Sequence, residues 1–111
     1  MLNQVVVIGR IAENLALNKS EDGKDVLKLI LAVPRNYKNI NGQYETDTIP
    51  CVLWNHSAKS TAEYCHKGDL VGIKGTLRSK TVSTKRDKVM TLEIIVEKVT
   101  FLTTNKTEEE S

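Results

Sequence analysis

Two cysteines and two histidines are the residues with the most obvious capacity for metal binding or nucleophilic chemistry: Cys51, His56, Cys65 and His66. Their spacing matches no zinc-binding pattern, in which ligands come in close pairs at set separations. Free cysteine is among the most buried residue types. We therefore interpret both cysteines as small core residues and both histidines as surface residues, and we expect no metal site, no cofactor and no Cys–His nucleophile.

Other motifs also fail to indicate catalysis. Glu45 and Asp47 lie close together, but nothing in the sequence suggests a second carboxylate group across a cleft from them. Gly72 and Gly75 fall inside an expected strand and lack the Gly-Lys-Ser/Thr ending of a phosphate-binding loop. We expect no catalytic residue, and the sequence favours a binding protein over an enzyme.

Basic residues, in contrast, form a pattern. Side chains of a strand alternate between its two faces, so a strand over 70–82 presents several cations on one face, and two expected loops, 83–88 and 35–44, add more. The cations are Lys74, Arg78 and Lys80 on the strand, Lys85, Arg86 and Lys88 in the first loop, and Arg35 and Lys38 in the second. All but Lys88 are candidate phosphate contacts.

Aromatic residues accompany these cations. Tyr37 lies within the basic loop, and Trp54 ends a strand on the polar side of its alternation. Single-stranded nucleic acid needs a cationic track for its phosphates and aromatic faces for its bases. We interpret Tyr37 and Trp54 as stacking platforms. The alternative is a solvated basic face with packed aromatics. Tyr64 and Phe101 receive no binding role, and the role of Tyr44 stays open.

Length and composition limit the other possibilities. The chain has 111 residues, 40% of them hydrophobic, which fits one domain. Its longest apolar stretches fall well short of the roughly 20 residues of a membrane helix, and we see no secretion signal. Two cysteines make no disulfide framework, so a cytoplasmic location is expected. Without residues 103–111 the chain carries 15 Lys and Arg against 11 Asp and Glu, which predicts a basic domain over 1–102 and a short acidic tail over 103–111.

Periodicity predicts five strands and one helix. Gly9 is expected to mark a bulge or bend, and Gly72 and Gly75 a bend or a close backbone approach. The helix is expected to be capped by Asn55 or Ser57 and to end at Lys67-Gly68. The strands are expected over 3–12, 25–34, 45–55, 70–82 and 89–102, and the helix over 57–66.

This order, β-β-β-α-β-β, predicts an all-β fold. Closure into a barrel removes exposed sheet edges, and glycines inside strands permit the bending that closure needs. The five-stranded OB-fold barrel has this form, with one short helix between strands three and four.

Several segments also resemble the bacterial single-stranded DNA-binding protein family, over about residues 1–102. They read MLNQVVVIGRI, LAVPRNYKN, NGQYETD, CVLWN, AEYCHKGDLVGIKGTLRSK and VEKVTFL. The likeness is greatest to short members from low-GC Gram-positive bacteria and their mobile elements. It implies an OB-fold subunit of a homotetramer, with a dimer left open. The subunit would bind single-stranded DNA without strict sequence preference during replication, recombination and repair, at the nucleoid.

The resemblance also implies site residues. Family members commonly stack bases on four aromatic residues, and two of these positions carry over as Tyr37 and Trp54. Thr48 and Val82 stand where relatives usually have an aromatic residue. Of the basic residues, Lys38, Arg78 and Lys80 match the family, whereas Lys74 is expected from strand alternation.

The C-terminus departs from the family. Longer relatives end in an acidic tip with an apolar pair and a phenylalanine, which recruits replication and repair enzymes, whereas this chain ends in TEEES. We do not expect recruitment by that route. Two other functions stay open: an OB-fold interaction subunit of a primosome-like, phage or conjugative assembly with weak DNA binding, and an RNA-binding OB domain.

Overall fold

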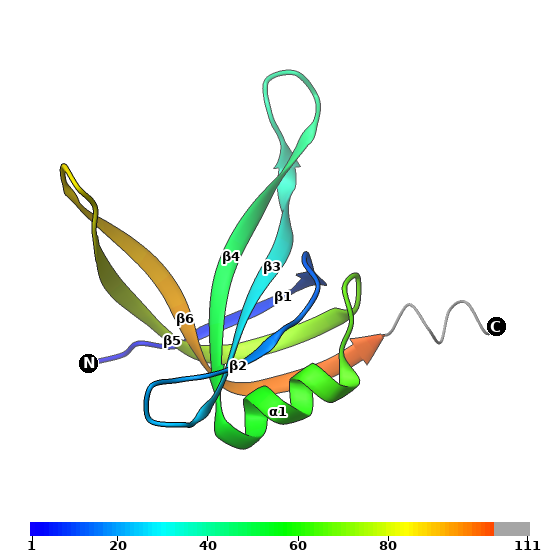
Figure 1. Cartoon of the computed structure of the whole chain (residues 1–111). Coiled ribbons are helices and arrows are strands. Elements are labelled where there is room, and N and C mark those ends of the chain that lie inside the picture. The colour runs from blue at the N-terminus through cyan, green and yellow to red at the C-terminus, as the bar shows by residue number, and fades with distance from the viewer. Residues whose placement is uncertain (104–111) are drawn as a thin grey trace.

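The computed structural model describes residues 1–103, and most of them lie in strands (Figure 1). A single helix, α1, lies between the fourth and fifth strands. The elements are β1 (Val5–Ile11), β2 (Leu17–Lys19), β3 (Asp25–Lys38), β4 (Tyr44–Trp54), α1 (Asn55–Tyr64), β5 (Leu70–Ser83) and β6 (Lys88–Thr103).

The strands form one sheet that closes into a barrel. Their order is β1-β5-β6-β4-β3-β2, and β1 also pairs with β3, which joins the two sides of the sheet. Only β4 and β6 pair in parallel. The all-β OB-fold prediction is therefore confirmed, with the helix in the expected place. The short strand β2, which pairs with the start of β3, was not predicted.

The core lies inside the barrel, where alternate residues of each strand face inward. Leu27, Leu29 and Leu31 of β3 are each at most 1% exposed, as their period-two spacing predicts. Leu53 of β4 packs in the same core, and Ala58 of α1 closes it from the helix side. Thr61 of α1 is buried as well, and the helix covers only one end of the barrel (Figure 1).

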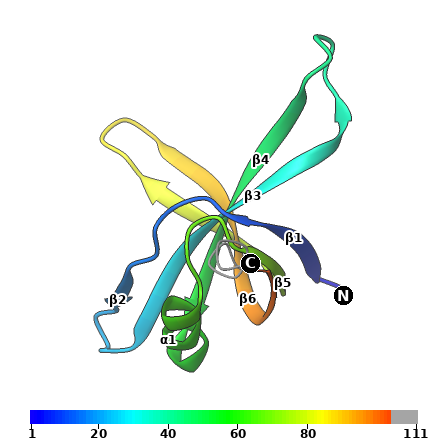
Figure 2. The same ribbon diagram turned by 90° about the vertical axis from the view of Figure 1, so that its right-hand side faces the viewer.

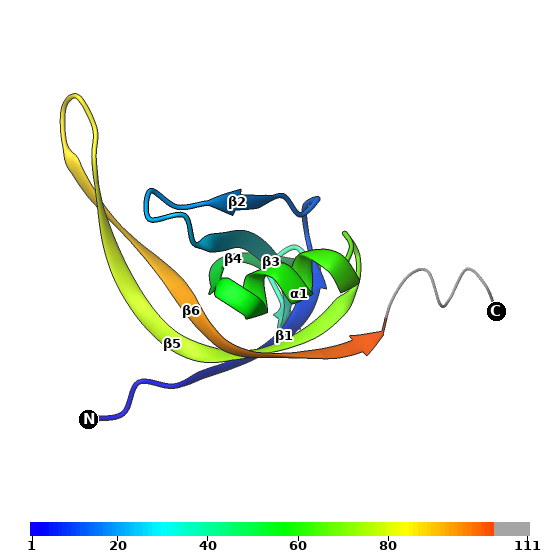
Figure 3. The same ribbon diagram turned by 60° about the horizontal axis from the view of Figure 1, so that its bottom comes forward.

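Two glycines allow the strands to approach closely where the barrel bends. Gly9 pairs with Val71 in regular register, so the predicted bulge is absent. A Cβ at Gly9 would lie 2.5 Å from the carbonyl oxygen of Ala32, where β1 meets β3. A Cβ at Gly75 would overlap the carbonyl oxygen of Ile95. Gly75 sits at a register shift, and Figure 3 shows β5 and β6 as one strongly bent ribbon.

The helix begins earlier than predicted. It spans Asn55–Tyr64, and Trp54 at its N-cap makes no side-chain capping hydrogen bond. The expected capping by Asn55 or Ser57 is therefore wrong. Asn55 takes a left-handed backbone conformation with φ of 57°, which Asn tolerates better than most residues. This conformation lets the chain turn from strand directly into helix.

Two hairpins extend beyond the barrel on the side away from α1 (Figures 1 and 2). We call β3–β4 from Pro34 to Thr46 the first arm, and β5–β6 from Thr76 to Ile95 the second arm. The predicted loop 35–44 shrinks to residues 39–43, because β3 continues through Lys38. Arg35, Tyr37 and Lys38 therefore stand on a strand.

Candidate nucleic-acid interface

The outer face of β3 and β4 carries Trp54. In the strand register Trp54 pairs with Val26 and Thr48 pairs with Ala32, so Trp54 and Thr48 share the side opposite to the buried Leu53. Trp54 is 40% exposed, which leaves part of the indole open to a ligand. Thr48 is also exposed but offers no ring for stacking.

This outer face continues across β6 to β5. Val52 of β4 pairs with Ile95 of β6, and Ile95 pairs with Thr76 of β5. Alternation then places Arg78 and Lys80 on the same side of the sheet as Trp54. Both are exposed, so the structure brings these two predicted cations onto one surface with the predicted platform.

Two more predicted cations lie at the tip of the second arm. Lys85 and Arg86 are exposed in the turn that joins β5 to β6. The turn is held from within, because Thr84 N–H donates to the Asp87 carbonyl at 2.7 Å and Asp87 N–H donates to Thr84 Oγ1 at 3.0 Å. Both cations therefore extend the basic track of Arg78 and Lys80 away from the barrel.

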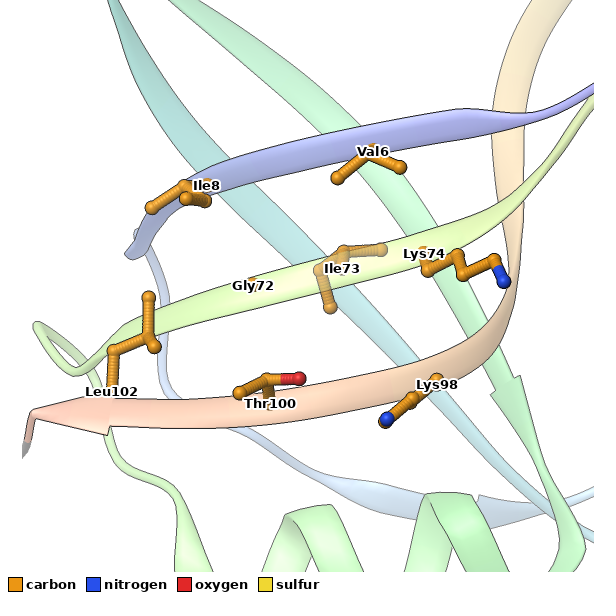
Figure 4. Close-up of a pocket in the computed structure, with 8 residues that line it drawn as sticks. All are labelled: Val6, Ile8, Gly72, Ile73, Lys74, Lys98, Thr100 and Leu102. Carbon is orange, nitrogen blue, oxygen red and sulfur yellow. The ribbon is translucent and has the colours of Figure 1, made fainter.

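Lys74 lies elsewhere. It stands opposite Lys98 and beside Val6 in a shallow pocket on the outer side of β1, β5 and β6 (Figure 4). Thr100 and Leu102 line the same pocket. Lys74 shares the outward side of β5 with Arg78 and Lys80, but it lies beyond the register shift at Gly75 and is grouped there with apolar side chains.

The first arm carries Tyr37 and Lys38 beside a bulge. Pro34 pairs with Thr46 and Lys38 with Tyr44, so three residues of β3 oppose Glu45 alone. Tyr37 is 63% exposed. The Lys38 ammonium lies 5.6 Å from the centroid of the Tyr44 ring, within reach of a cation–π interaction. Tyr44, whose role the sequence left open, alternates on β4 with Thr48 and Trp54.

Arg35 is engaged within the protein. Its Nη2 donates to Asp47 Oδ1 at 2.9 Å, and its Nη1 donates to Glu45 Oε2 at 2.5 Å. The hydrogen bond with Asp47 raises the pKa of Arg35 and lowers the pKa of Asp47. The sequence predicted a phosphate contact for Arg35, but two carboxylates occupy its guanidinium group. Sequence reasoning did not find this pairing, because Asp47 and Glu45 were considered only as catalytic groups.

The cysteines and histidines do not converge. Cys51 and Cys65 are buried and unbridged, as interpreted from the sequence. Burial raises the pKa of each thiol to about 11, so both stay protonated near neutral pH. Within residues 1–103 no three His, Cys, Asp or Glu side chains are placed to hold a metal ion. No helix in this part of the chain has the length and apolarity to cross a membrane.

Comparison with known proteins gives a consistent result. Residues 2–102 match the model of the single-strand binding protein family. Single-stranded DNA-binding protein B of Bacillus subtilis is 35% identical over 103 residues, which cover 92% of this chain and 91% of that protein. Single-stranded DNA-binding protein 1 of Lactococcus lactis is 34% identical over 109 residues, covering 97% and 73%. Single-stranded DNA-binding protein 3 of Streptococcus agalactiae is 30% identical over 112 residues, covering 100% and 81%. With its barrel, exposed Trp54 and basic arm, the chain belongs to the single-strand binding protein family.

Proposed function

We propose that this chain binds single-stranded DNA without strict sequence preference and protects it during replication, recombination and repair. The observation that carries the proposal is the shared outer face of β3, β4, β6 and β5, which combines Trp54 with Arg78 and Lys80. An aromatic face and free cations on one surface suit unpaired bases and their phosphates. The names of the relatives support the same ligand.

Stacking supplies the contacts to bases. Trp54 and Tyr37 are both open to solvent, and a stacked base in proteins of this class contributes about 1–3 kcal/mol. Neither Thr48 nor Val82 offers a ring. Each subunit therefore has two platforms, set at the barrel and on the first arm.

Phosphate contacts supply the rest of the affinity. We assign them to Lys38 on the first arm and to Arg78, Lys80, Lys85 and Arg86 on the second. Arg35 and Lys74 are left out because one is ion-paired and the other lies on a different part of the surface. Binding through cations releases counterions, so affinity should fall steeply with salt.

The chain acts by binding and not by catalysis, and it needs neither a cofactor nor a metal. Its thiols are buried and protonated, and the site uses only stacking and charge. We propose that the chain acts in the bacterial cytoplasm, at the nucleoid. Residues 1–102 form the domain that binds DNA. Apart from Thr103, which ends β6, the acidic tail, from which no enzyme recruitment is expected, lies outside the described residues.

We infer that the chain forms a homo-oligomer through β1. From Val5 to Ile8 this strand pairs with β5 on one side, and its pairing with β3 involves only Arg10 and Ile11. Its other edge is therefore free to pair with a second β1 across a two-fold axis. Val6 and Ile8 are 72% and 58% exposed on the apolar face of Figure 4. Two such dimers packed face to face would bury this surface and give a tetramer.

The test of DNA binding uses Trp54, which is the only tryptophan. Its fluorescence should be quenched on titration with oligo-dT, and the affinity should fall with salt. By anisotropy of labelled oligo-dT, Trp54→Ala should bind about 5- to 150-fold more weakly, the equivalent of one stacked base. Tyr64→Ala on α1, 65% exposed, is the matched control and should bind normally.

Three outcomes would contradict parts of the proposal. Wild-type protein that fails to bind oligo-dT at low salt would overturn it. Normal binding by a folded Trp54→Ala variant would remove Trp54 from the site. Tighter binding of oligo-U than of oligo-dT would indicate an RNA ligand instead, since the 2′-OH distinguishes the two.

A further inference from the structure

The first arm lies outside the barrel core and needs another source of rigidity. Its strands project from the barrel on their own (Figure 2), and none of the residues from Pro34 to Thr46 is buried. An isolated two-stranded hairpin is only marginally stable in water. The arm nevertheless carries Tyr37 and Lys38, whose positions matter if they contact DNA.

The arm is also interrupted at the place where these residues stand. Three residues, Arg35 to Tyr37, oppose the single residue Glu45. Regular ladder pairing is therefore lost beside Tyr37. The Arg35 side chain bridges this gap, because it reaches Glu45 and Asp47 on the neighbouring strand.

The bridge extends to the tip of the arm. Glu45 Oε1 accepts a hydrogen bond from Asn39 Nδ2 at 3.4 Å. Asn39 Oδ1 in turn accepts from the N–H groups of Asn41 and Gln43, at 2.9 Å and 3.0 Å. A polar network thus runs from Asp47 to the turn and ties the arm together over its length.

The network lies on the side of the arm away from Trp54. Arg35 follows Val33 by two residues on β3, and Asp47 precedes Ile49 by two on β4, so both continue the core-facing side of their strands. Trp54 and Thr48 occupy the opposite side. Lys38, in contrast, lies over Tyr44, which alternates on β4 with Thr48 and Trp54, whereas the guanidinium group of Arg35 is held by two carboxylates.

We propose that Arg35 is a positioning residue for DNA binding: by pairing with Asp47 and Glu45 it holds the bulge that presents Tyr37 and Lys38, and it makes no phosphate contact. This inference rests on the proposed function, because it concerns how the DNA-binding arm is kept in shape. It replaces the role that the sequence predicted for Arg35.

The two roles predict opposite effects of Asp47→Asn. Were Arg35 a phosphate contact, removal of the Asp47 charge would free it for DNA and reduce repulsion, so binding would tighten. If Arg35 positions the arm, loss of the Asp47 charge loosens the bulge, so binding weakens. The sign of the change therefore separates the roles.

The experiment measures affinity for labelled oligo-dT by anisotropy at several salt concentrations. Arg35→Gln and Asp47→Asn should each weaken binding about three- to tenfold, part of the value of one stacked base, with the salt slope unchanged. Lys80→Gln is the matched control for a phosphate contact and should lower the slope by about 0.7. Circular dichroism checks that each variant is folded.

A double-mutant cycle tests whether Arg35 acts through Tyr37. In a Tyr37→Ala background, Arg35→Gln should cost little further affinity, because the platform it positions is already gone. Lys80→Gln should keep its full effect in that background. A general loss of stability would not depend on Tyr37 in this way.

The outcomes distinguish the two proposals. A lower salt slope for Arg35→Gln, tighter binding by Asp47→Asn, or additive effects of Arg35→Gln and Tyr37→Ala would overturn the positioning role while leaving DNA binding intact. Wild-type protein that does not bind oligo-dT would overturn both proposals. A Lys80→Gln slope equal to that of the wild type would count against the phosphate track only.

Discussion

In each arm, one face of the hairpin continues the side of the barrel strands that faces the core. The residues on this face differ between the two arms. On the first arm this side carries charges, because Arg35 is ion-paired with Glu45 and with Asp47 at the base of the arm. On the second arm it carries apolar side chains, since Met90 and Leu92 continue the alternation of the buried Ile94 and are 68% and 51% exposed. Within residues 1–103 no salt bridge joins β5 to β6.

Their backbones differ accordingly. The first arm has a bulge beside Tyr37, whereas the second keeps one register without interruption from Gly75 to Ser83. At its base the Asn3 side chain prolongs the β1 ladder, donating to the Leu77 carbonyl at 2.8 Å and accepting from Leu77 N–H at 2.9 Å. The comparison indicates that side-chain charges shape the first arm and that backbone pairing shapes the second.

The largest effect is expected at the base of the second arm. Gly75→Ala would push a methyl group into the Ile95 carbonyl, at the register shift from which the arm departs. Because the obstacle is backbone, we expect a loss of about 2–3 kcal/mol in the free energy of unfolding, as for overpacked cores. Urea denaturation at fixed protein concentration measures it.

Gly72→Ala is the matched control on the same strand. A Cβ there has its nearest neighbour, Thr100 Cβ, at 3.7 Å, an ordinary contact distance. Its unfolding free energy should stay within about 1 kcal/mol of the wild type. Equal stability of the two variants would show that backbone packing at Gly75 does not limit the second arm.

The sequence predicted the barrel because the core strands alternate cleanly, as Leu27, Leu29 and Leu31 do. It missed β2, whose three residues are all exposed and therefore carry no alternation. It placed the start of the helix late, because the turn into α1 depends on the left-handed backbone of Asn55 and not on a capping side chain. Solvent-facing features of this kind leave little trace in hydrophobic periodicity.

The sequence predicted each site residue separately, whereas the structure shows which of them lie on the same face of the sheet. Arg78 and Lys80 share a face with Trp54 only because β4 pairs with β6 in parallel, a topological fact that no local pattern encodes. The pairing of Arg35 with Asp47 depends on strand register beside a bulge. Charge alone could not distinguish a structural arginine from one that is free to bind phosphate.

The second arm offers cations but no ring, so an added platform should strengthen binding. Val82 is 41% exposed and pairs with Val89 on the face of Arg78 and Lys80. Val82→Trp should tighten binding to oligo-dT by about 1–3 kcal/mol, which is roughly 5- to 150-fold. Anisotropy at one salt concentration suffices.

Thr81→Trp is the control for Val82→Trp, because Thr81 is the neighbouring exposed residue on the other side of β5. It should change the affinity little. If both variants tightened binding equally, any added aromatic ring would suffice, and the assignment of the outer face as the DNA surface would be lost.

Lowering the pH is expected to have the smallest effect, and it should change the first arm more than the second. The hydrogen bond from Arg35 lowers the pKa of Asp47 below its ordinary value of 3.8. A carboxylate with a lowered pKa stabilises the folded arm fully above 3.8, and this stabilisation is lost as the pH falls through the folded pKa. As the pH falls below 3.8, the amide resonances of residues 36–44 should therefore shift with loss of the Arg35–Asp47 pair. Those of residues 78–80 should shift less, because no salt bridge within residues 1–103 involves them.

In Arg35→Gln the Asp47 midpoint should rise toward 3.8, and an unchanged midpoint would mean that the ion pair does not hold the first arm in solution.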